Sequence, residues 1–229
     1  MSIVKSRSWL RIAAALAVAA LAVSACGTLK MGAAAITGDS SISSASLTNQ
    51  IADLNVAYKA DTAKGVKPQR PVGQEAQQVL TWLILFRVYD QVAARNHIYI
   101  TPAQADRQLA QLTSQAKSSK VTLTEYVTAG GALPPDLLPQ LGQYFAIVSA
   151  LEGRIDGGKT PTTTAGQSKV ESAVAHDQCV ASKDLGVTVN PQFGVWDYHT
   201  YSVVAAAPAL AAAASPSPSA TPALTTPPC

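Results

Sequence analysis

Cysteine and histidine offer the most reactive side chains in this sequence, and both are scarce, with three of each among 229 residues. His176, Asp177 and Cys179 fall within one turn of an expected helix, a spacing that can place two metal ligands on one face. A structural zinc ion needs four ligands, and the sequence offers no second pair. We therefore expect no metal site and no cofactor.

Catalytic groups are equally hard to assemble from the sequence. His97 and His199 have no recognisable nucleophile as a partner, and no serine lies in the Gly-x-Ser-x-Gly pattern of a nucleophile elbow. The glycine pairs at Gly130 and Gly157 follow expected helices and not strands, so they predict helix ends and not a phosphate-binding loop. We expect no enzymatic activity.

Cys26 stands in a context that gives it a different chemistry. Three basic residues open the chain: Lys5, Arg7 and Arg11. An apolar stretch over residues 12–23 follows, which is the layout of a secretory signal peptide and is shorter than the roughly 20 residues that span a bilayer. We expect residues 1–25 to be a signal peptide, cleaved between Ala25 and Cys26.

The residues at this cleavage point, Val-Ser-Ala-Cys at 23–26, resemble the lipobox of bacterial lipoproteins. The resemblance implies diacylglycerol on the Cys26 thiol and acylation of the freed amine, with fatty acids such as palmitate. Buried acyl chains contribute about 0.8 kcal/mol per CH₂, so the protein would be anchored at the extracytoplasmic face of the cell membrane without a spanning helix. The alternative is an ordinary signal peptide followed by a chance cysteine.

Removing the signal peptide changes the charge of the chain. Of 17 Lys and Arg, three lie in the signal peptide, and the 14 that remain match 14 Asp and Glu. A neutral chain lacks the basic surface of a nucleic-acid-binding protein, so no nucleic-acid partner is expected. Charged residues make up only 14% of the sequence, below the usual quarter, so apolar surface should stay exposed after folding.

Two features concern the later part of the chain. Residues 205–229 are alanine, proline, serine and threonine with few large apolar side chains, which predicts a disordered tail. Cys179 and Cys229 both remain after cleavage, and an oxidising compartment would allow a disulfide between them, although the sequence does not require one.

Hydrophobic periodicity predicts a mainly helical domain over residues 26–204. Residues 30–43 fit a short strand, a turn and a second strand, and residues 187–204 fit extended chain. Capping boxes at Thr101 and Thr122 predict two of the helix starts. The expected helices cover about residues 46–64, 74–96, 101–116, 122–131, 137–155 and 167–185, and the second is apolar almost all round, as in the centre of a bundle.

Three stretches resemble the SurA N-terminal family. They are AAAITGDSSISSASLTNQIADL (33–54), QQVLTWLILFRVYDQVAARNHIYITPAQADRQLAQL (77–112) and VNPQFGVWD (189–197). The third is the most specific, with Gln192 where the family usually has arginine. The resemblance implies a helical bundle of the SurA N-terminal type with a small β-structure formed by the N- and C-terminal segments.

The same resemblance implies a chaperone outside the cytoplasm whose partners are unfolded or partly folded secreted proteins. Family members often carry a parvulin-type prolyl isomerase domain, which here would fall between Ile155 and Val170. Only a short polar connection lies there, whereas a domain needs on the order of 100 residues. Two rivals remain open: a foldase related to the prolyl isomerases, and an envelope lipoprotein that binds or assembles with one partner.

The last of the three stretches is expected to be structural. Pro191 should mark the entrance to the final extended segment, and Gly194 should allow a close approach or a bend. Trp196 should cover the bundle beside the strand at 33–37. The residues assigned to this motif are Asn190, Pro191, Phe193, Gly194 and Trp196.

Overall fold

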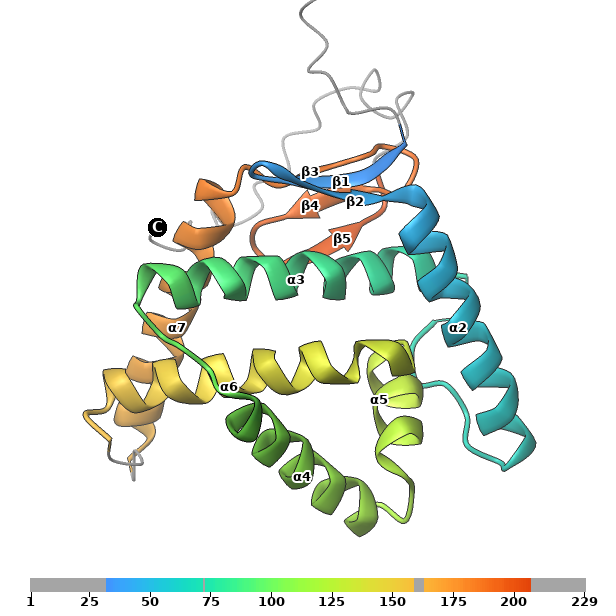
Figure 1. The fold of residues 1–229 in the computed structure, drawn as a ribbon, viewed down its shortest axis with the longest axis horizontal. Coiled ribbons are helices and arrows are strands. Elements are labelled where there is room, and N and C mark those ends of the chain that lie inside the picture. The colour runs from blue at the N-terminus through green and yellow to red at the C-terminus, as the bar shows by residue number, and fades with distance from the viewer. Residues whose placement is uncertain (1–31, 72, 159–162, 207–229) are drawn as a thin grey trace, which may run out of the picture. The chain divides into compact units, whose positions relative to one another are not determined.

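The computed structural model describes residues 32–71, 73–158 and 163–206 (Figure 1). The expected signal peptide, its cleavage point at Ala25 and Cys26, and residues 207–229 of the expected tail lie outside the described residues. In chain order the elements are β1 (Ala33–Thr37), β2 (Ser40–Ser43), α2 (Ser44–Ala63), α3 (Glu75–Arg95), α4 (Pro102–Ser118), α5 (Leu123–Gly131), the 3₁₀ turn η2 (Pro135–Leu137), α6 (Leu138–Ile155), α7 (Thr164–Asp184), β3 (Thr188–Val189), β4 (Val195–Asp197) and β5 (Ser202–Val204). The expectation of a mainly helical domain with a small β-structure is confirmed.

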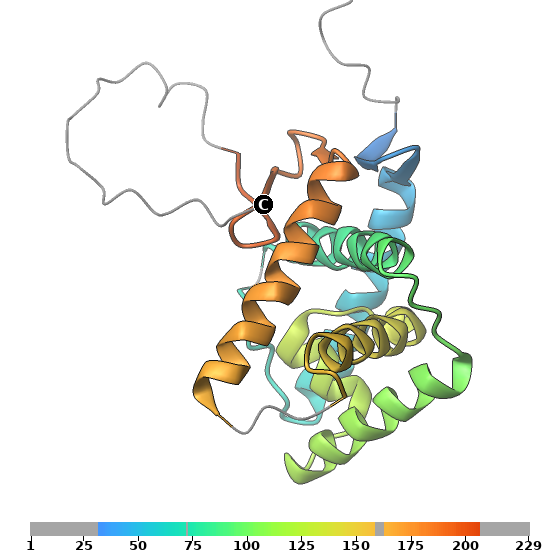
Figure 2. The same ribbon diagram turned by 90° about the vertical axis from the view of Figure 1, so that its left-hand side faces the viewer.

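Helix α3 is the centre of this unit. The strands lie along one side of it and α6 along the other, while α2 and α7 contact it as well (Figures 1 and 2). Neighbours on several sides explain why its apolar residues run almost all round the helix. Those that are buried are Val79, Leu80, Ile84, Phe86, Val88, Tyr89, Val92 and Ala93.

Side-chain caps account for the starts of α2, α4, α5 and α7. The backbone N–H of Thr101 donates to Gln104 Oε1 at 2.8 Å, as the sequence predicts for α4. Helices α2 and α7 begin two and three residues earlier than expected, at Ser44 and Thr164. Their N-caps explain the difference, because a serine or threonine at this position satisfies a free backbone N–H. They are Ser43, which accepts from the Ser46 N–H, and Thr163, which accepts from the Gly166 N–H.

The two ends of the described unit meet in one antiparallel sheet. Strand β1 is central, with β2 on one side and β3 on the other, and Ala35 pairs with both Ile42 and Val189. Asn190 extends the join, because its backbone N–H donates to Ala34 O at 2.8 Å and its Nδ2 to Ala33 O at 3.2 Å. The predicted pairing of N- and C-terminal segments is confirmed.

The expectation of one extended run over residues 187–204 is wrong in part. Turns divide the run into β3 and a separate hairpin of β4 and β5. Short side chains make both turns, because Asn190 Oδ1 accepts the Gln192 N–H at 3.2 Å and Asp197 Oδ1 accepts the His199 N–H at 2.8 Å. Such Asx turns compete with a strand ladder for the backbone.

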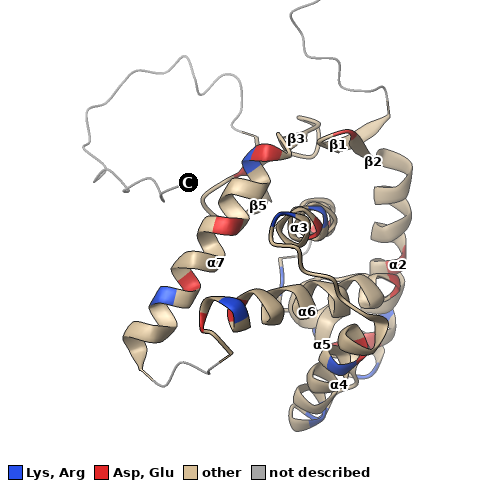
Figure 3. Cartoon of the chain, turned by 60° about the vertical axis from the view of Figure 1, so that its left-hand side comes forward, with Lys and Arg blue, Asp and Glu red and all other residues tan. Residues whose placement is uncertain are grey.

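Helices α4 and α6 approach one another closely at Gly142. A Cβ added there would lie 2.9 Å from Leu109 Cγ and 3.0 Å from Ala105 O, so only glycine fits without displacing α4. Charged residues are sparse along the described elements (Figure 3), as the composition predicts. None of the described helices has the length and apolar character that would let it cross a membrane.

Candidate binding groove

A groove of about 450 Å³ lies where α3, α4, α5 and α6 meet the segment that follows α2. We call it the apolar groove, because most of its side chains are hydrocarbon or aromatic. They come from segments far apart in the sequence, and the main ones are Val66, Trp82, Leu112, Val121, Leu141 and Phe145. Its volume falls within the range of ordinary ligand pockets.

Aromatic rings support one wall of the apolar groove. Trp82 and Tyr144 meet edge to face with centroids 6.1 Å apart, and Tyr144 meets Phe145 at 5.1 Å. The indole Nε1–H of Trp82 donates to Gly131 O at 2.7 Å, which fixes the ring against the end of α5. A large aromatic surface held in one orientation favours contact with apolar ligands.

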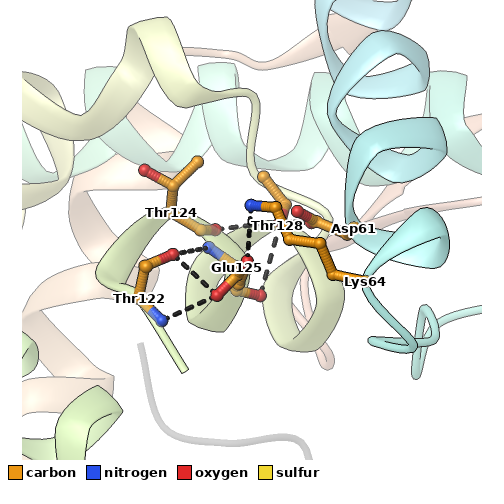
Figure 4. A network of polar contacts seen from close by, with 6 residues as sticks. All are labelled: Asp61, Lys64, Thr122, Thr124, Glu125 and Thr128. Atoms are coloured by element: carbon orange, nitrogen blue, oxygen red, sulfur yellow. Dashed lines mark hydrogen bonds and ion pairs between the residues drawn. The ribbon is translucent and has the colours of Figure 1, made fainter. Parts of the chain in front are cut away.

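A polar network joins the end of α2 to α5 beside this groove (Figure 4). The Thr128 hydroxyl donates to Asp61 Oδ2 at 2.5 Å, and both residues are buried. One turn away, Lys64 Nζ contacts Glu125 Oε1 at 2.8 Å. Because both pairs connect the C-terminal end of α2 to α5, they hold α5, and with it one wall of the groove, in place.

The carboxylate of Glu125 is the one acidic group among the groove's lining residues. The hydrogen bond from Lys64 lowers the pKa of Glu125 to about 2, and the backbone and hydroxyl donors of Thr122 contribute to the shift. A carboxylate with so low a pKa is a poor proton donor or acceptor near neutral pH. Its role at this site is to cap α5 and to bind Lys64.

The low pKa of Glu125 predicts a pH dependence of stability. A carboxyl whose pKa falls from 4.5 to about 2 on folding stabilises the protein fully above pH 4.5, and this contribution is lost as the pH falls toward 2. Burial raises the pKa values of Asp90 and Glu152. Protonation of these two carboxyl groups as the pH falls therefore favours the folded protein, which is the opposite of the effect of Glu125. We expect Glu125→Gln to abolish part of the loss of stability between pH 4.5 and 2.

Urea unfolding of the two proteins at a series of pH values measures this contribution. The difference between wild type and Glu125→Gln isolates Glu125, because Asp90 and Glu152 are present in both. Parallel stability curves from pH 6 to pH 2 would contradict the assigned pKa.

The predicted C-terminal motif lies away from the apolar groove, since none of its five residues lines it. The close approach predicted at Gly194 is confirmed, because a Cβ there would lie 2.2 Å from Val204 O. Pro191 is exposed in the turn before β4, as expected for the entrance to the last extended segment. Trp196 is 8% exposed, and its Nε1–H donates to the buried Ser182 Oγ at 2.9 Å.

The residues considered for metal binding do not converge. His176 is exposed on α7, whereas Cys179 is 3% exposed and is not a free thiol. Across the described ranges, no three His, Cys, Asp or Glu side chains are arranged to hold a metal ion. Cys229, which the sequence offers as a possible but not a required partner for Cys179, lies outside the described residues.

Sequence reasoning did not single out the residues that form the apolar groove. Trp82 was expected only as part of a central helix, and nothing marked Val66 or Tyr126. Asp61 did carry a signal, because it continues the apolar stripe of Leu54 and Tyr58 at helical spacing and is therefore a carboxylate facing the interior.

No protein-family model, curated protein or solved structure gives a significant match to this chain. Its resemblance to the SurA N-terminal family is confined to the three sequence stretches at 33–54, 77–112 and 189–197.

Proposed function

We propose that this chain is a membrane-anchored chaperone-like module of the SurA type, which holds apolar segments of unfolded or partly folded secreted proteins outside the cytoplasm. The observation that carries the proposal is the apolar groove with its wall of aromatic rings. A holdase covers exposed apolar segments of a client and needs no chemical step, which agrees with a groove whose one carboxylate is held ionised.

The composition of the groove suits clients of varied sequence. Apolar contacts have no directional demand, so a wall built from Val66, Trp82 and Leu112 can accept many different hydrophobic side chains. Glu125 is paired with Lys64 and therefore imposes little selection by charge. Binding of this kind favours hydrophobic segments in general over one defined partner.

The groove can be tested by placing a charge in it. Val66→Lys should weaken binding of an apolar peptide at least about tenfold, because the ammonium group must lose water when a ligand covers it. Val56→Lys is the matched control, since Val56 is 67% exposed on α2 and does not line the groove. The measurements are peptide affinity and suppression of aggregation of a denatured protein.

Equal loss in both lysine variants would show that the effect is one of surface charge. No loss in either would exclude the apolar groove as the binding site. Thermal unfolding of both variants shows whether the fold is retained.

The membrane anchor is a separate part of the proposal and depends on the lipobox-like residues 23–26. Cys26→Ala is expected to leave an uncleaved precursor and to abolish incorporation of labelled fatty acid. Both effects follow because the thiol of Cys26 is the expected site of diacylglycerol transfer. Labelled lipid on the Cys26→Ala protein would contradict the assignment.

A further inference from the structure

A second hollow, of about 420 Å³, shares Trp82 and Gly131 with the apolar groove but has a different character. Glutamines from the start of α3 line one side, and the turn and strand of the β4–β5 hairpin line the other. We call it the glutamine hollow. Its defining residues are Gln74, Gln77, Gln78, Thr81, Thr200 and Tyr201.

The glutamine hollow offers hydrogen-bonding groups and almost no charge. Its one charged lining residue is Arg70, whose Nε donates to Gly130 O at 3.2 Å. Gln78 Nε2 donates to Pro71 O at 3.4 Å, while its buried Oε1 has no partner among the described residues. A buried acceptor without a partner is unfavourable, and a backbone N–H of a bound chain would satisfy it.

The last described strand, β5, forms part of the wall of this hollow. The backbone N–H of Val203 in β5 donates to Thr81 Oγ1 at 2.8 Å, and both residues line the hollow. Thr81 in turn donates to Gln77 O at 2.7 Å. Strand β5 is thus fastened to α3 at the hollow, and residues 207–229 continue from Ala206, two residues beyond this strand.

The sequence of residues 207–229 matches the hollow in chemistry. The segment has no charged residue, and its prolines are at positions 208, 216, 218, 222, 227 and 228. Proline-rich chains favour an extended helix whose carbonyls are free to accept hydrogen bonds, and such chains bind in aromatic-lined grooves. Trp82 and Tyr201 supply the aromatic rings, and the glutamine amides supply donors.

We propose that the glutamine hollow is a binding site for an uncharged, proline-containing extended chain, and that residues 207–229 are its occupant. Four residues of extended chain span at most about 14 Å, which is the greatest distance that can separate Leu210 from Ala206. A tether this short gives an effective concentration in the millimolar range, so a weak intrinsic affinity is enough. The proposal concerns the glutamine hollow and not the apolar groove, and it does not depend on chaperone function.

Photo-crosslinking in the full chain tests the occupant directly. A photoreactive amino acid at Gln77 should crosslink within one molecule to residues 207–229, as read by mass spectrometry of the monomer band. The same amino acid at Gln115 is the control, because Gln115 is exposed on α4 and lines neither hollow. Equal crosslinking from both positions, crosslinks only between molecules, or none to this segment would overturn the proposal.

Competition gives a second, independent readout. A synthetic peptide of residues 207–228 should bind about tenfold tighter to a chain whose own segment is replaced by glycine and serine of equal length, because the tethered segment no longer competes. Gln77→Arg should weaken this binding, whereas Gln115→Arg should not. Equal affinity for the replaced and unaltered chains would overturn the proposal.

The two proposals can fail separately. Val66→Lys is expected to impair client binding while leaving the crosslink from Gln77 to residues 207–229 unchanged. Replacement of residues 207–228 should abolish that crosslink whether or not the apolar groove binds clients.

Discussion

Gly194→Ala is expected to lower the free energy of unfolding by about 4 kcal/mol, from backbone strain and steric overlap together. The φ angle of Gly194 is +131°, a backbone conformation that residues with a side chain rarely adopt. The new methyl group would also lie 2.2 Å from Val204 O, on the strand to which β4 is paired. Because the obstacle is backbone and not a movable side chain, the hairpin must shift to admit it.

Urea unfolding measures the effect, with Gly153→Ala as the matched control. Gly153 lies in α6 with nothing near its added Cβ. Alanine there should leave the stability unchanged or raise it by up to about 1 kcal/mol, because it suits a helix better than glycine. Equal stability of Gly194→Ala and wild type would contradict the close approach of β4 and β5.

Trp196→Ala is expected to lower the free energy of unfolding by about 3 to 5 kcal/mol, as for other buried aromatic residues. The ring is 8% exposed and belongs to the same core cluster as residues of α3 and β1. Its removal also leaves Ser182 Oγ buried without its donor. The loss is large against the 5 to 15 kcal/mol that stabilises a typical domain.

Two further variants separate the contributions of the ring and its hydrogen bond. Trp196→Phe keeps much of the apolar surface but removes the bond to Ser182, at an expected cost of about 1 to 3 kcal/mol. Val195→Ala, in the same strand at a side chain 44% exposed, should change the stability by less than about 0.5 kcal/mol. An unchanged melting temperature of Trp196→Ala together with lost client binding would instead make this ring part of a binding surface.

Features encoded by neighbouring residues could be predicted from the sequence. The capping boxes at Thr101 and Thr122 fixed helix starts, because the partner side chain lies three residues along the chain. The paired strands at 33–43 were predicted from a loose alternation of residue types around the turn at Gly38 and Asp39. The join between β1 and β3, by contrast, was inferred from the family resemblance and not from any local signal.

Features that depend on tertiary packing were missed for a physical reason. The bond between Asp61 and Thr128 joins residues 67 apart, and no periodicity relates them. The apolar groove forms where α4, α5 and α6 meet beside Trp82. The sequence of any one of these helices does not determine how it packs against the others. The hairpin of β4 and β5 was missed because Asx turns at Asn190 and Asp197 interrupt an otherwise strand-like composition.

The central claim, that the apolar groove binds unfolded chains, is tested most directly by crosslinking from its rim. A photoreactive amino acid replaces Tyr126, which lines the groove and is 37% exposed, or Tyr99, which does not line it and is 86% exposed. Each purified protein is mixed with a chemically denatured secreted protein and irradiated. The account predicts crosslinks from position 126 but not from position 99, and their loss in the Val66→Lys background. Equal crosslinking from both positions, or none from position 126, would contradict it.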